Sequence, residues 1–561
     1  MPSSGSAVSA KKTESQRILS IPVRTYHDIT PGEITRSLAK PGCGFELRLI
    51  QEAALTAIKE CRGGFFPIGV GHGKSFIACL AASVLECDFA IIFAPASTVR
   101  QLQEQYDDLR AHFRLVPARI MSYATLSQPK GTTLLTELVE RYSADKVVLV
   151  CDEAHRLKRL ESARTKRIIR FMRANPKVSF VALSGTMTSK SLRDFSHLAE
   201  LCLRDNSPVP RDRYHLNCWS ECIDVDGRPG QTEWRQLGPL AKWAGMDLST
   251  VRGQRRKEMV RKAFQKRMRS APGVVASKEG SIGCSLNIQR VRDLVVPDDV
   301  TQMMRAVSDA GIDPAGDIIP DDVTAWRTLR HLAAGFYYKW DWEDGEEDLD
   351  WLRARRDWNR FVRHELMDNS EEGYDSPFLV AAKINRELEA GQNRAIHRAW
   401  RNWQREKIKP APPTIAVWVD SYLINYSLDW LSKQKTPAIL WYESSAVGEA
   451  LRERGLTVYG AGQEPPREAH PCAMSIKACG IGKNLQSWSQ QLVIEPPTGG
   501  LIWEQLLGRT HRQGQQADEV SCSILQHVEP YTRALESAVI QAHYIFDSSG
   551  NAQKLLFATF D

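Results

Sequence analysis

The sequence predicts an α/β protein with two parallel-sheet lobes and a largely helical insertion between them. Short apolar runs bounded by polar turns recur before residue 205 and again after residue 411, with amphipathic stretches between them. Continuous apolar runs are typical of strands buried on both faces of a parallel sheet. Their alternation with helical stretches favours βαβ units, and a chain of 561 residues is long enough for several cores.

Changes in composition divide the chain into four expected segments. Residues 1–40 are expected to be a flexible N-terminal segment, and residues 41–205 the first lobe. Residues 206–410 are too many for a plain linker, so we expect a helical insertion. A Pro-rich stretch at 409–413 marks the start of the second lobe, residues 411–561.

The overall composition excludes a membrane protein and permits nucleic-acid binding. No apolar run approaches the roughly 20 residues of a membrane span, so we expect no membrane partner and an intracellular location. The net charge of +7 is small for this length, so any DNA-binding surface depends on local charge. Twelve cysteines scattered through expected strands and helices favour reduced thiols over disulfides.

A glycine-rich stretch in the first lobe has the residue types of a phosphate-binding loop, namely Gly71, His72, Gly73, Lys74 and Ser75. Glycines let backbone amides approach phosphate oxygens, and the helix expected from 76 to 85 directs its positive end toward them. The lysine neutralises phosphate charge, and Ser75 is a predicted ligand of Mg²⁺.

An acidic pair follows the apolar run at 146–151. Asp152 is predicted to hold Mg²⁺, directly or through water, and Glu153 to orient and deprotonate the attacking water. Together with the loop upstream, this pair predicts a site that hydrolyses a nucleotide.

A third group of motif residues lies in the second lobe. Arg509 and Arg512 are three positions apart, so on a helix they would share a face and reach a phosphate carried by the other lobe. The stretch 475–486 adds two glycines and polar residues just before an expected strand at 491–494.

Taken together, these motifs resemble those of superfamily 2 DEAH-box helicases, and within them the Swi/Snf-like translocases of double-stranded DNA. The most specific signal is the sequence Gly-Arg-Thr-His-Arg-Gln-Gly-Gln at 508–515, and the motifs follow in order over 45–205 and 415–530. The resemblance implies RecA-like lobes, ATP and Mg²⁺ as cofactors, and a catalytic set of Asp152, Glu153, Gln505, Arg509 and Arg512. It also implies nucleotide contacts from Gly482 and from an adenine-recognition segment with Arg48 and Gln51, in which Ile50 replaces the family's usual aromatic residue.

The function implied is an ATP-dependent motor that translocates on double-stranded DNA with little sequence preference. Two alternatives stay open: a helicase that separates strands of DNA or, with less support, RNA, and a nucleotide-gated DNA clamp or scaffold without turnover. The resemblance further suggests a monomer in the cytoplasm of a bacterium or a phage-infected cell, with protein partners in replication, recombination or repair.

Two features of the expected insertion each allow two interpretations. Basic residues crowd the stretch 251–270 around the single acid Glu258, which fits contact with DNA phosphates or a solvated helix. Several tryptophans follow, and their spacing favours packing over base stacking: Trp326, Trp340, Trp342, Trp351, Trp358, Trp400 and Trp403.

Overall fold

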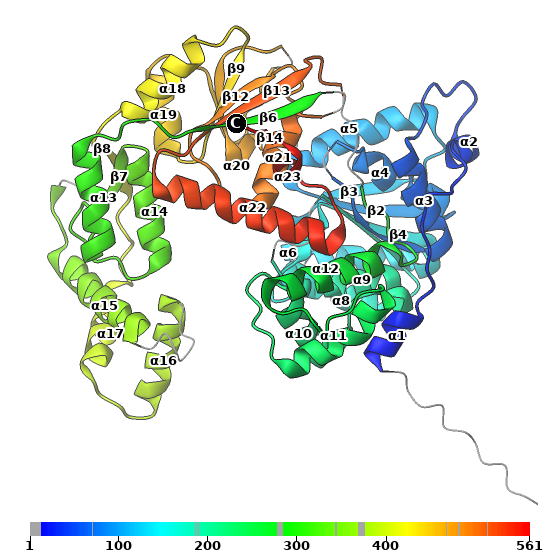
Figure 1. Cartoon of the computed structure of the whole chain (residues 1–561), viewed down its shortest axis with the longest axis horizontal. Coiled ribbons are helices and arrows are strands. Elements are labelled where there is room, and N and C mark those ends of the chain that lie inside the picture. Colours follow the sequence, from blue (N-terminus) through cyan, green and yellow to red (C-terminus); the bar gives the residue numbers. More distant parts are fainter. Residues whose placement is uncertain are drawn as a thin grey trace, which may run out of the picture.

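The computed structural model describes residues 13–69, 71–128, 130–185, 187, 190–277, 284–342, 345–368, 376–466, 468–480, 483–512 and 514–561. Over these ranges the chain forms two parallel sheets, an arm of helices beside the second sheet, and a long C-terminal helix that runs from the second sheet toward the first (Figure 1). The predicted α/β class with parallel sheets is confirmed.

The first sheet contains five parallel strands in the order β1-β5-β4-β2-β3. Their bounds are β1 Gly63–Pro67, β2 Phe89–Ala94, β3 Ala118–Ser122, β4 Val147–Asp152 and β5 Ser179–Ser184. The expected apolar run at 146–151 thus coincides with β4 to within one residue. Every residue of β1, β2, β4 and β5 is buried, as expected for strands covered by helices on both faces.

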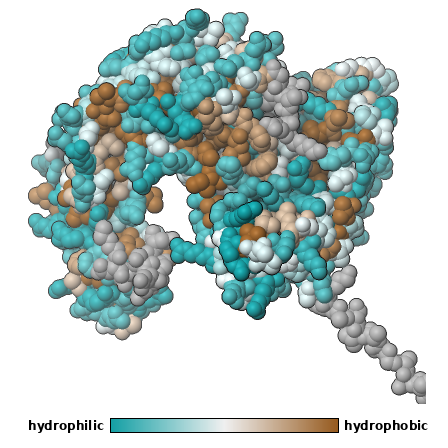
Figure 2. Space-filling view, in the orientation of Figure 1, coloured by the Kyte–Doolittle hydropathy of each residue, from teal (hydrophilic) through white to brown (hydrophobic). Residues whose placement is uncertain are grey.

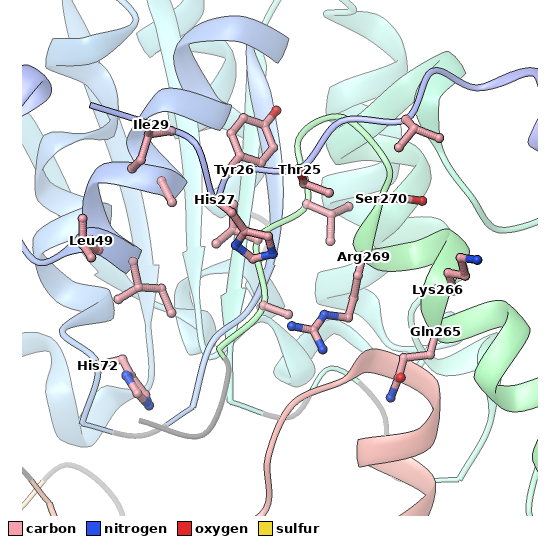
Figure 3. A pocket seen from close by; sticks show the side chains of 16 residues that line it. Thr25, Tyr26, His27, Ile29, Leu49, His72, Gln265, Lys266, Arg269 and Ser270 are labelled. Atoms are coloured by element: carbon pink, nitrogen blue, oxygen red, sulfur yellow. The ribbon is translucent and has the colours of Figure 1, made fainter. Parts of the chain in front are cut away.

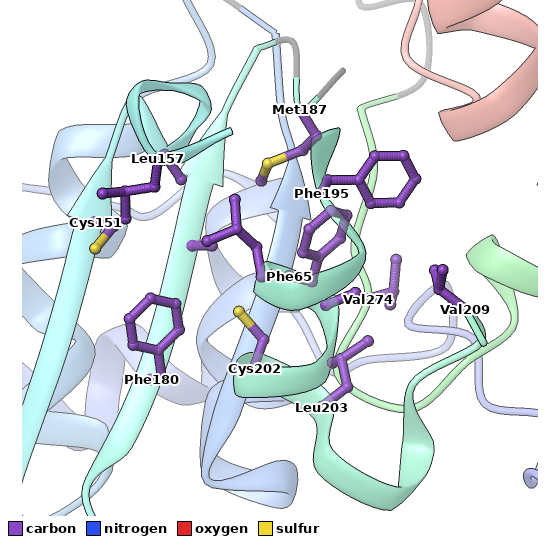
Figure 4. Close-up of a cluster of buried hydrophobic side chains, with 14 of the residues drawn as sticks. Phe65, Cys151, Leu157, Phe180, Met187, Phe195, Cys202, Leu203, Val209 and Val274 are labelled. Atoms are coloured by element: carbon purple, nitrogen blue, oxygen red, sulfur yellow. The ribbon is translucent and has the colours of Figure 1, made fainter. Parts of the chain in front are cut away.

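Helices cover both faces of this sheet. One core contains residues of α3 (Leu49–Cys61), α4 (Lys74–Val84) and α5 (Ala96–His112). The other contains residues of α6 (Tyr123–Ser127), α7 (Lys130–Tyr142), α8 (Ala163–Ala174) and α9 (Ser196–Leu203). Figure 4 shows part of this second core, where Phe65, Phe180 and Phe195 pack beside Cys202 and Leu203. Short 3-10 turns connect these elements at Ala144–Lys146, Ala154–Leu157, Leu192–Asp194 and Arg204–Asn206.

The second sheet has seven parallel strands in the order β10-β11-β9-β12-β13-β6-β14. Their bounds are β6 Ser285–Val291, β9 Ala438–Tyr442, β10 Val458–Tyr459, β11 Cys472–Ser475, β12 Gln490–Val493, β13 Glu519–Leu525 and β14 Thr559–Phe560. In β9, Ile439 and Trp441 belong to one core while Leu440 and Tyr442 belong to the other, because successive side chains of a strand point to opposite faces. The flanking helices are α18 (Tyr422–Ser432), α19 (Ser445–Glu453), α20 (Ile476–Cys479), α21 (Gly500–Thr510), α22 (Glu529–Ser549) and α23 (Lys554–Phe557).

The segment expected as a single helical insertion, 206–410, is divided among three places. Its first helices share the core of the first lobe: α10 (Arg213–Ile223), α11 (Gln231–Trp243) and α12 (Gly253–Arg269). Strand β6 lies between β13 and β14 of the second sheet. The sequence analysis did not place this strand in the second lobe, because β6 pairs with a strand more than 200 residues later in the chain.

The remainder of that segment forms an arm beside the second sheet (Figure 1). The arm consists of α13 (Asp298–Ala310), α14 (Asp322–Ala333), β7 (Phe336–Trp340), α15 (Leu349–Asp368), α16 (Pro377–Glu389), α17 (Ala395–Glu406) and β8 (Thr414–Trp418). The antiparallel pair β7 and β8 connects its outer helices to the lobe. Trp351 contacts the rings of Trp340, Trp342 and Trp403, and Trp358 contacts Trp400, so packing is confirmed for these tryptophans.

The N-terminal segment from residue 13 onward is folded against the first lobe, which the expectation of a flexible 1–40 segment did not include. Helix α1 (Glu14–Ser20) begins with a capping box at Thr13, and Arg17 donates to the carbonyl oxygens of Ser207 and Val209. Helix α2 (Glu33–Leu38) begins against the buried Glu52 carboxylate, which accepts from the backbone amides of Ile34 and Thr35. Residues 1–12 lie outside the described ranges.

The basic helix α12 uses much of its charge inside the fold. Arg261 is 6% exposed and donates from Nε to the Ile223 carbonyl oxygen at 2.7 Å, which caps the end of α10. Arg267 is fully buried against the Trp243 ring, and Arg256 lies over Trp234. The density of charge in this helix is therefore explained in part by packing rather than by DNA contact alone.

Across the described residues, every helix is too short or too polar to cross a membrane. All twelve cysteines are free thiols, and most are buried in the two lobes, in line with the expectation from their distribution.

We predict that Arg261→Ala lowers the free energy of unfolding by about 2–4 kcal/mol, because it leaves buried carbonyl groups at the end of α10 without a donor. The matched control is Lys262→Ala, at the neighbouring exposed position, which should change stability by less than about 0.5 kcal/mol. Urea unfolding of both variants measures the difference. Equal free energies of unfolding for the two variants would contradict the capping role of Arg261.

Candidate functional site

The glycine-rich loop connects β1 to α4 at the carboxyl edge of the first sheet. Gly71 and Gly73 have φ values of +90° and +73°, which side chains other than glycine rarely adopt. At Gly73 a Cβ atom would lie 2.1 Å from Nε2 of Gln51, so a side chain there would also displace the Gln51 amide. Helix α4 then begins at Lys74 without a side-chain cap, so its first amide groups and its positive end face the loop.

Lys74 lies between the loop and the acidic pair. Its ammonium donates to the carbonyl oxygens of Ile68 and Gly69 at 3.1 and 3.2 Å, and it lies 3.9 Å from Oε1 of Glu153. The side chain is 9% exposed. The loop lysine and the predicted base are therefore brought together from residues nearly 80 positions apart.

Asp152 and Glu153 lie at the carboxyl end of β4, and both are buried. Glu153 has a φ of +53°, so the chain turns sharply after the strand. Tyr123 donates to the Asp152 carbonyl oxygen at 2.7 Å and fixes this turn from the neighbouring helix. Because β1, β4 and β5 are parallel, their carboxyl ends bring the loop, the acidic pair and residues 184–185 to one edge.

The two acidic side chains have opposite electrostatic environments. Burial, reinforced by the adjacent Glu153 carboxylate, raises the pKa of Asp152 above its ordinary value. Burial acts in the same direction on Glu153, but Lys74, His155 and Arg509 outweigh it and hold the pKa of Glu153 below its ordinary value. Glu153 is thus the ionised member of the pair, which suits a base.

A hydrogen-bond network orients Glu153. Ser184, at the end of β5, lies 3.3 Å from Oε2 of Glu153 and 3.0 Å from Nδ1 of His155. His155 Nδ1 is itself 3.3 Å from the same carboxylate oxygen. Ser184 therefore contacts the Glu153 carboxylate directly. Its neighbour Thr186 lies outside the described residues.

Arg48 and Gln51, at the start of α3, contact the glycine-rich loop. Arg48 donates to the Gly71 carbonyl oxygen at 3.0 Å, and Gln51 donates to the Gly73 carbonyl oxygen at 3.3 Å. Gln51 Oε1 also accepts from the Arg48 backbone amide at 2.9 Å, which fixes the Gln51 side chain at the start of α3.

A cavity of about 860 Å³ opens beside this end of α3 (Figure 3). His27 and Ile29 of the N-terminal segment, Leu49 of α3, His72 of the loop and Arg269 of α12 are among its lining residues. Its walls are mainly apolar, and a planar heterocycle has room there next to the phosphate loop. The N-terminal segment thus lines this cavity, whereas the adenine-recognition segment expected from the sequence covered only residues near 48–51.

The second lobe brings its arginines to this loop, but by a different geometry from the one expected. Helix α21 ends at Thr510, so Arg512 lies beyond the helix and the expectation that Arg509 and Arg512 share a helical face is wrong. Arg512 Cβ lies 3.5 Å from the position of a Cβ built on Gly71, which places Arg512 directly against the loop. Arg509 is buried and donates to the carbonyl oxygens of Gly480 and Lys483 within its own lobe.

Positive charge converges on the loop from both lobes. Burial, together with Lys74, Lys554 and Arg48, lowers the pKa of His72 to about 4. Burial and the neighbouring Arg48 also lower the pKa of Arg512. Such crowding of cations costs free energy unless an anion offsets it, so the electrostatics of this site favour a polyanionic ligand.

The oxygen ligands predicted for Mg²⁺ have suitable chemistry. Ser75 is half-buried in the first turn of α4, and the Asp152 carboxylate lies at the end of β4. A hard cation bound by few protein oxygens and by phosphates fits this set, and it would offset the buried charge of Asp152.

Of two further expected site residues, the structure describes one. Gln505 is buried in α21, and no hydrogen bond or ion pair within the described ranges joins it to the loop or the acidic pair. Gly482 lies outside the described residues. Conversely, Ser277, Asn551 and Lys554 contribute to the surroundings of the site without any motif that identifies them. His155 ends the Asp-Glu-Ala-His motif but was not among the expected site residues.

Comparison with known proteins adds no assignment, because no protein-family model and no curated protein matches the chain.

We predict that Asp152→Asn stabilises the ligand-free protein at pH 8 by about 1–2 kcal/mol, because it removes a buried carboxylate beside Glu153. A raised pKa in the folded state contributes stability at acid pH that is lost as the pH rises through that pKa. The gain should therefore shrink toward pH 4. Urea unfolding in EDTA measures it, with the exposed Asp145→Asn as control; equal or lower stability of the variant at pH 8 would contradict the buried-charge account.

Proposed function

We propose that this protein is an ATP-driven motor that moves along double-stranded DNA, with two RecA-like lobes. The observation that carries the proposal is the position of Arg512 against Gly71, which makes one phosphate site out of residues from two separate sheets. A nucleotide bound there contacts both lobes, so its binding and hydrolysis shift the equilibrium between closed and open arrangements.

The residues of the first lobe account for hydrolysis. Lys74 and the amide groups at the start of α4 hold the phosphates, and ionised Glu153 accepts a proton from the attacking water. Ser75 and Asp152 would hold Mg²⁺, which supplies charge stabilisation when bound. Arg512 approaches from the other lobe and stabilises the charge of the transferring phosphoryl group.

The arm supports a duplex as the track. Figure 2 shows an open gap between the arm and the lower part of the first lobe, below the second lobe. The arm is joined to the second lobe through β7 and β8, and its residues share a core with that lobe. Relative movement of the lobes therefore changes the width of the gap, which provides a physical link between nucleotide state and grip on DNA.

We predict that Lys74→Ala loses ATP binding, while Glu153→Gln binds ATP and lowers turnover by about 100-fold or more, because the two residues have separate roles in phosphate neutralisation and proton acceptance. Binding is measured by calorimetry and turnover by phosphate release. Lys435→Ala and Glu161→Gln, both at exposed positions away from the loop, are the matched controls. Turnover near the wild-type rate in either site variant would overturn the assignment.

We predict that duplex DNA stimulates the ATPase more than single-stranded DNA or RNA, and that the stimulation falls steeply with salt because phosphate contacts are screened. Phosphate release is measured in parallel without nucleic acid and with each of the three. Displacement of the third strand from a triplex, without separation of a forked duplex, is the expected signature of translocation. Unwinding of the fork with a preference for single strands would favour the helicase alternative.

A further inference from the structure

The last segment of the chain returns to the phosphate loop. Helix α22 ends at Ser549, and Gly550, with a φ of +72°, ends the helix in a left-handed turn. Figure 1 shows α22 reaching the first lobe, and α23 lies beside α21 in the second. Residues 551–554 thus run from one lobe to the other past the nucleotide site.

Asn551 fixes this segment to both sides of the site. The side chain is fully buried and donates to the carbonyl oxygen of Gly185, just after β5. Its Oδ1 accepts from Ser277 at 2.6 Å, and Ser277 in turn accepts from the backbone amide of Gly69 at 3.1 Å. Hydrogen bonds therefore tie this segment to the start of the glycine-rich loop and to the residue that follows β5.

Lys554 is placed three residues later by the second lobe. Its backbone amide donates to Glu504 of α21 at 2.7 Å, and its ammonium donates to Nδ1 of His511 at 3.3 Å. His511 uses Nε2 to donate to the Cys284 carbonyl oxygen at 2.9 Å, so Nδ1 is the free acceptor. His511 directly precedes Arg512, so the same turn orients the lysine and the arginine that faces Gly71.

The ammonium of Lys554 forms no ion pair with any residue that the structure describes, although the buried Glu504 of α21 acts on its charge from farther away. Among the residues that the structure describes, no carboxylate oxygen lies within 4.0 Å of its ammonium, and its hydrogen-bond partner is a neutral imidazole. Burial and Lys554 lower the pKa of His511 to about 4, so this imidazole does not carry charge at neutral pH. Lys554 helps to lower the pKa of His72 in the glycine-rich loop. Burial and Arg512 lower the pKa of Lys554 itself, against the opposing effect of Glu504.

We propose that Lys554 is a further phosphate-binding residue, supplied by the C-terminal segment, which contacts the terminal phosphate of a nucleoside triphosphate. This inference rests on the proposed nucleotide site. An ammonium is a compact charge suited to phosphate oxygens, and an anion between Lys554, Arg512 and Lys74 offsets cations that otherwise repel one another. The C-terminal segment thereby couples occupancy of the site to the contact between the lobes.

The test measures ATP and ADP affinity by calorimetry in the full chain with Mg²⁺, in a Glu153→Gln background that prevents turnover. Lys554→Met removes the charge and keeps most of the stem, and Lys554→Arg keeps the charge. We expect Lys554→Met to weaken ATP binding by about tenfold or more and ADP binding less, with Lys554→Arg close to the parent. The exposed Lys435→Met is the matched control.

If Lys554→Met does not fold, Lys554→Gln is measured in its place, because its amide still donates to His511 but carries no charge. Thermal unfolding of each variant identifies losses of fold. ATP affinity equal to the parent in a folded, uncharged variant, while Lys74→Ala abolishes binding, would overturn the role of Lys554 and leave the nucleotide site standing. Failure of the parent to bind ATP would overturn both.

Discussion

The buried acidic pair at the carboxyl edge of the first sheet is the constraint on which the site depends. Two adjacent carboxylates in a dry environment repel each other, and the protein offsets this with cations from both lobes: Lys74 from the glycine-rich loop and Arg509 from α21. Ser184 and His155 complete the hydrogen bonds of Glu153. Burial of this pair therefore depends on positive charge from the glycine-rich loop and from the second lobe.

The contact between the lobes is polar and local where it approaches the nucleotide site. Asn551, Ser277 and the backbone of Gly69 and Gly185 form a buried chain of hydrogen bonds, and Arg512 lies against Gly71. Buried polar networks fix one relative arrangement and are costly when partly satisfied. A ligand that moves the loop consequently acts on the C-terminal segment and through it on α22, which is the structural basis for coupling proposed here.

Helix α12 illustrates how charge density alone misleads. The same arginines that suggest a DNA-binding face also cap the end of α10 and cover tryptophan rings, because a guanidinium combines several donors with a flat apolar surface. Exposed basic residues of the helix, among them Arg255 and Lys262, stay available to solvent. The tryptophans of the arm show the reverse case, in which the packing that their spacing favoured is the one observed.

The sequence by itself determined the elements whose signal is local: the strands β4 and β12, the helix after the glycine-rich loop, and the residue types of Lys74 and Glu153. These depend on runs of apolar residues and on turns within a few positions. Only the tertiary structure decided that β6 belongs to the second sheet, that Arg512 lies beyond α21, and that Lys554 returns to the loop. Those features arise from contacts between residues hundreds of positions apart, which packing and chain direction set and no short pattern encodes.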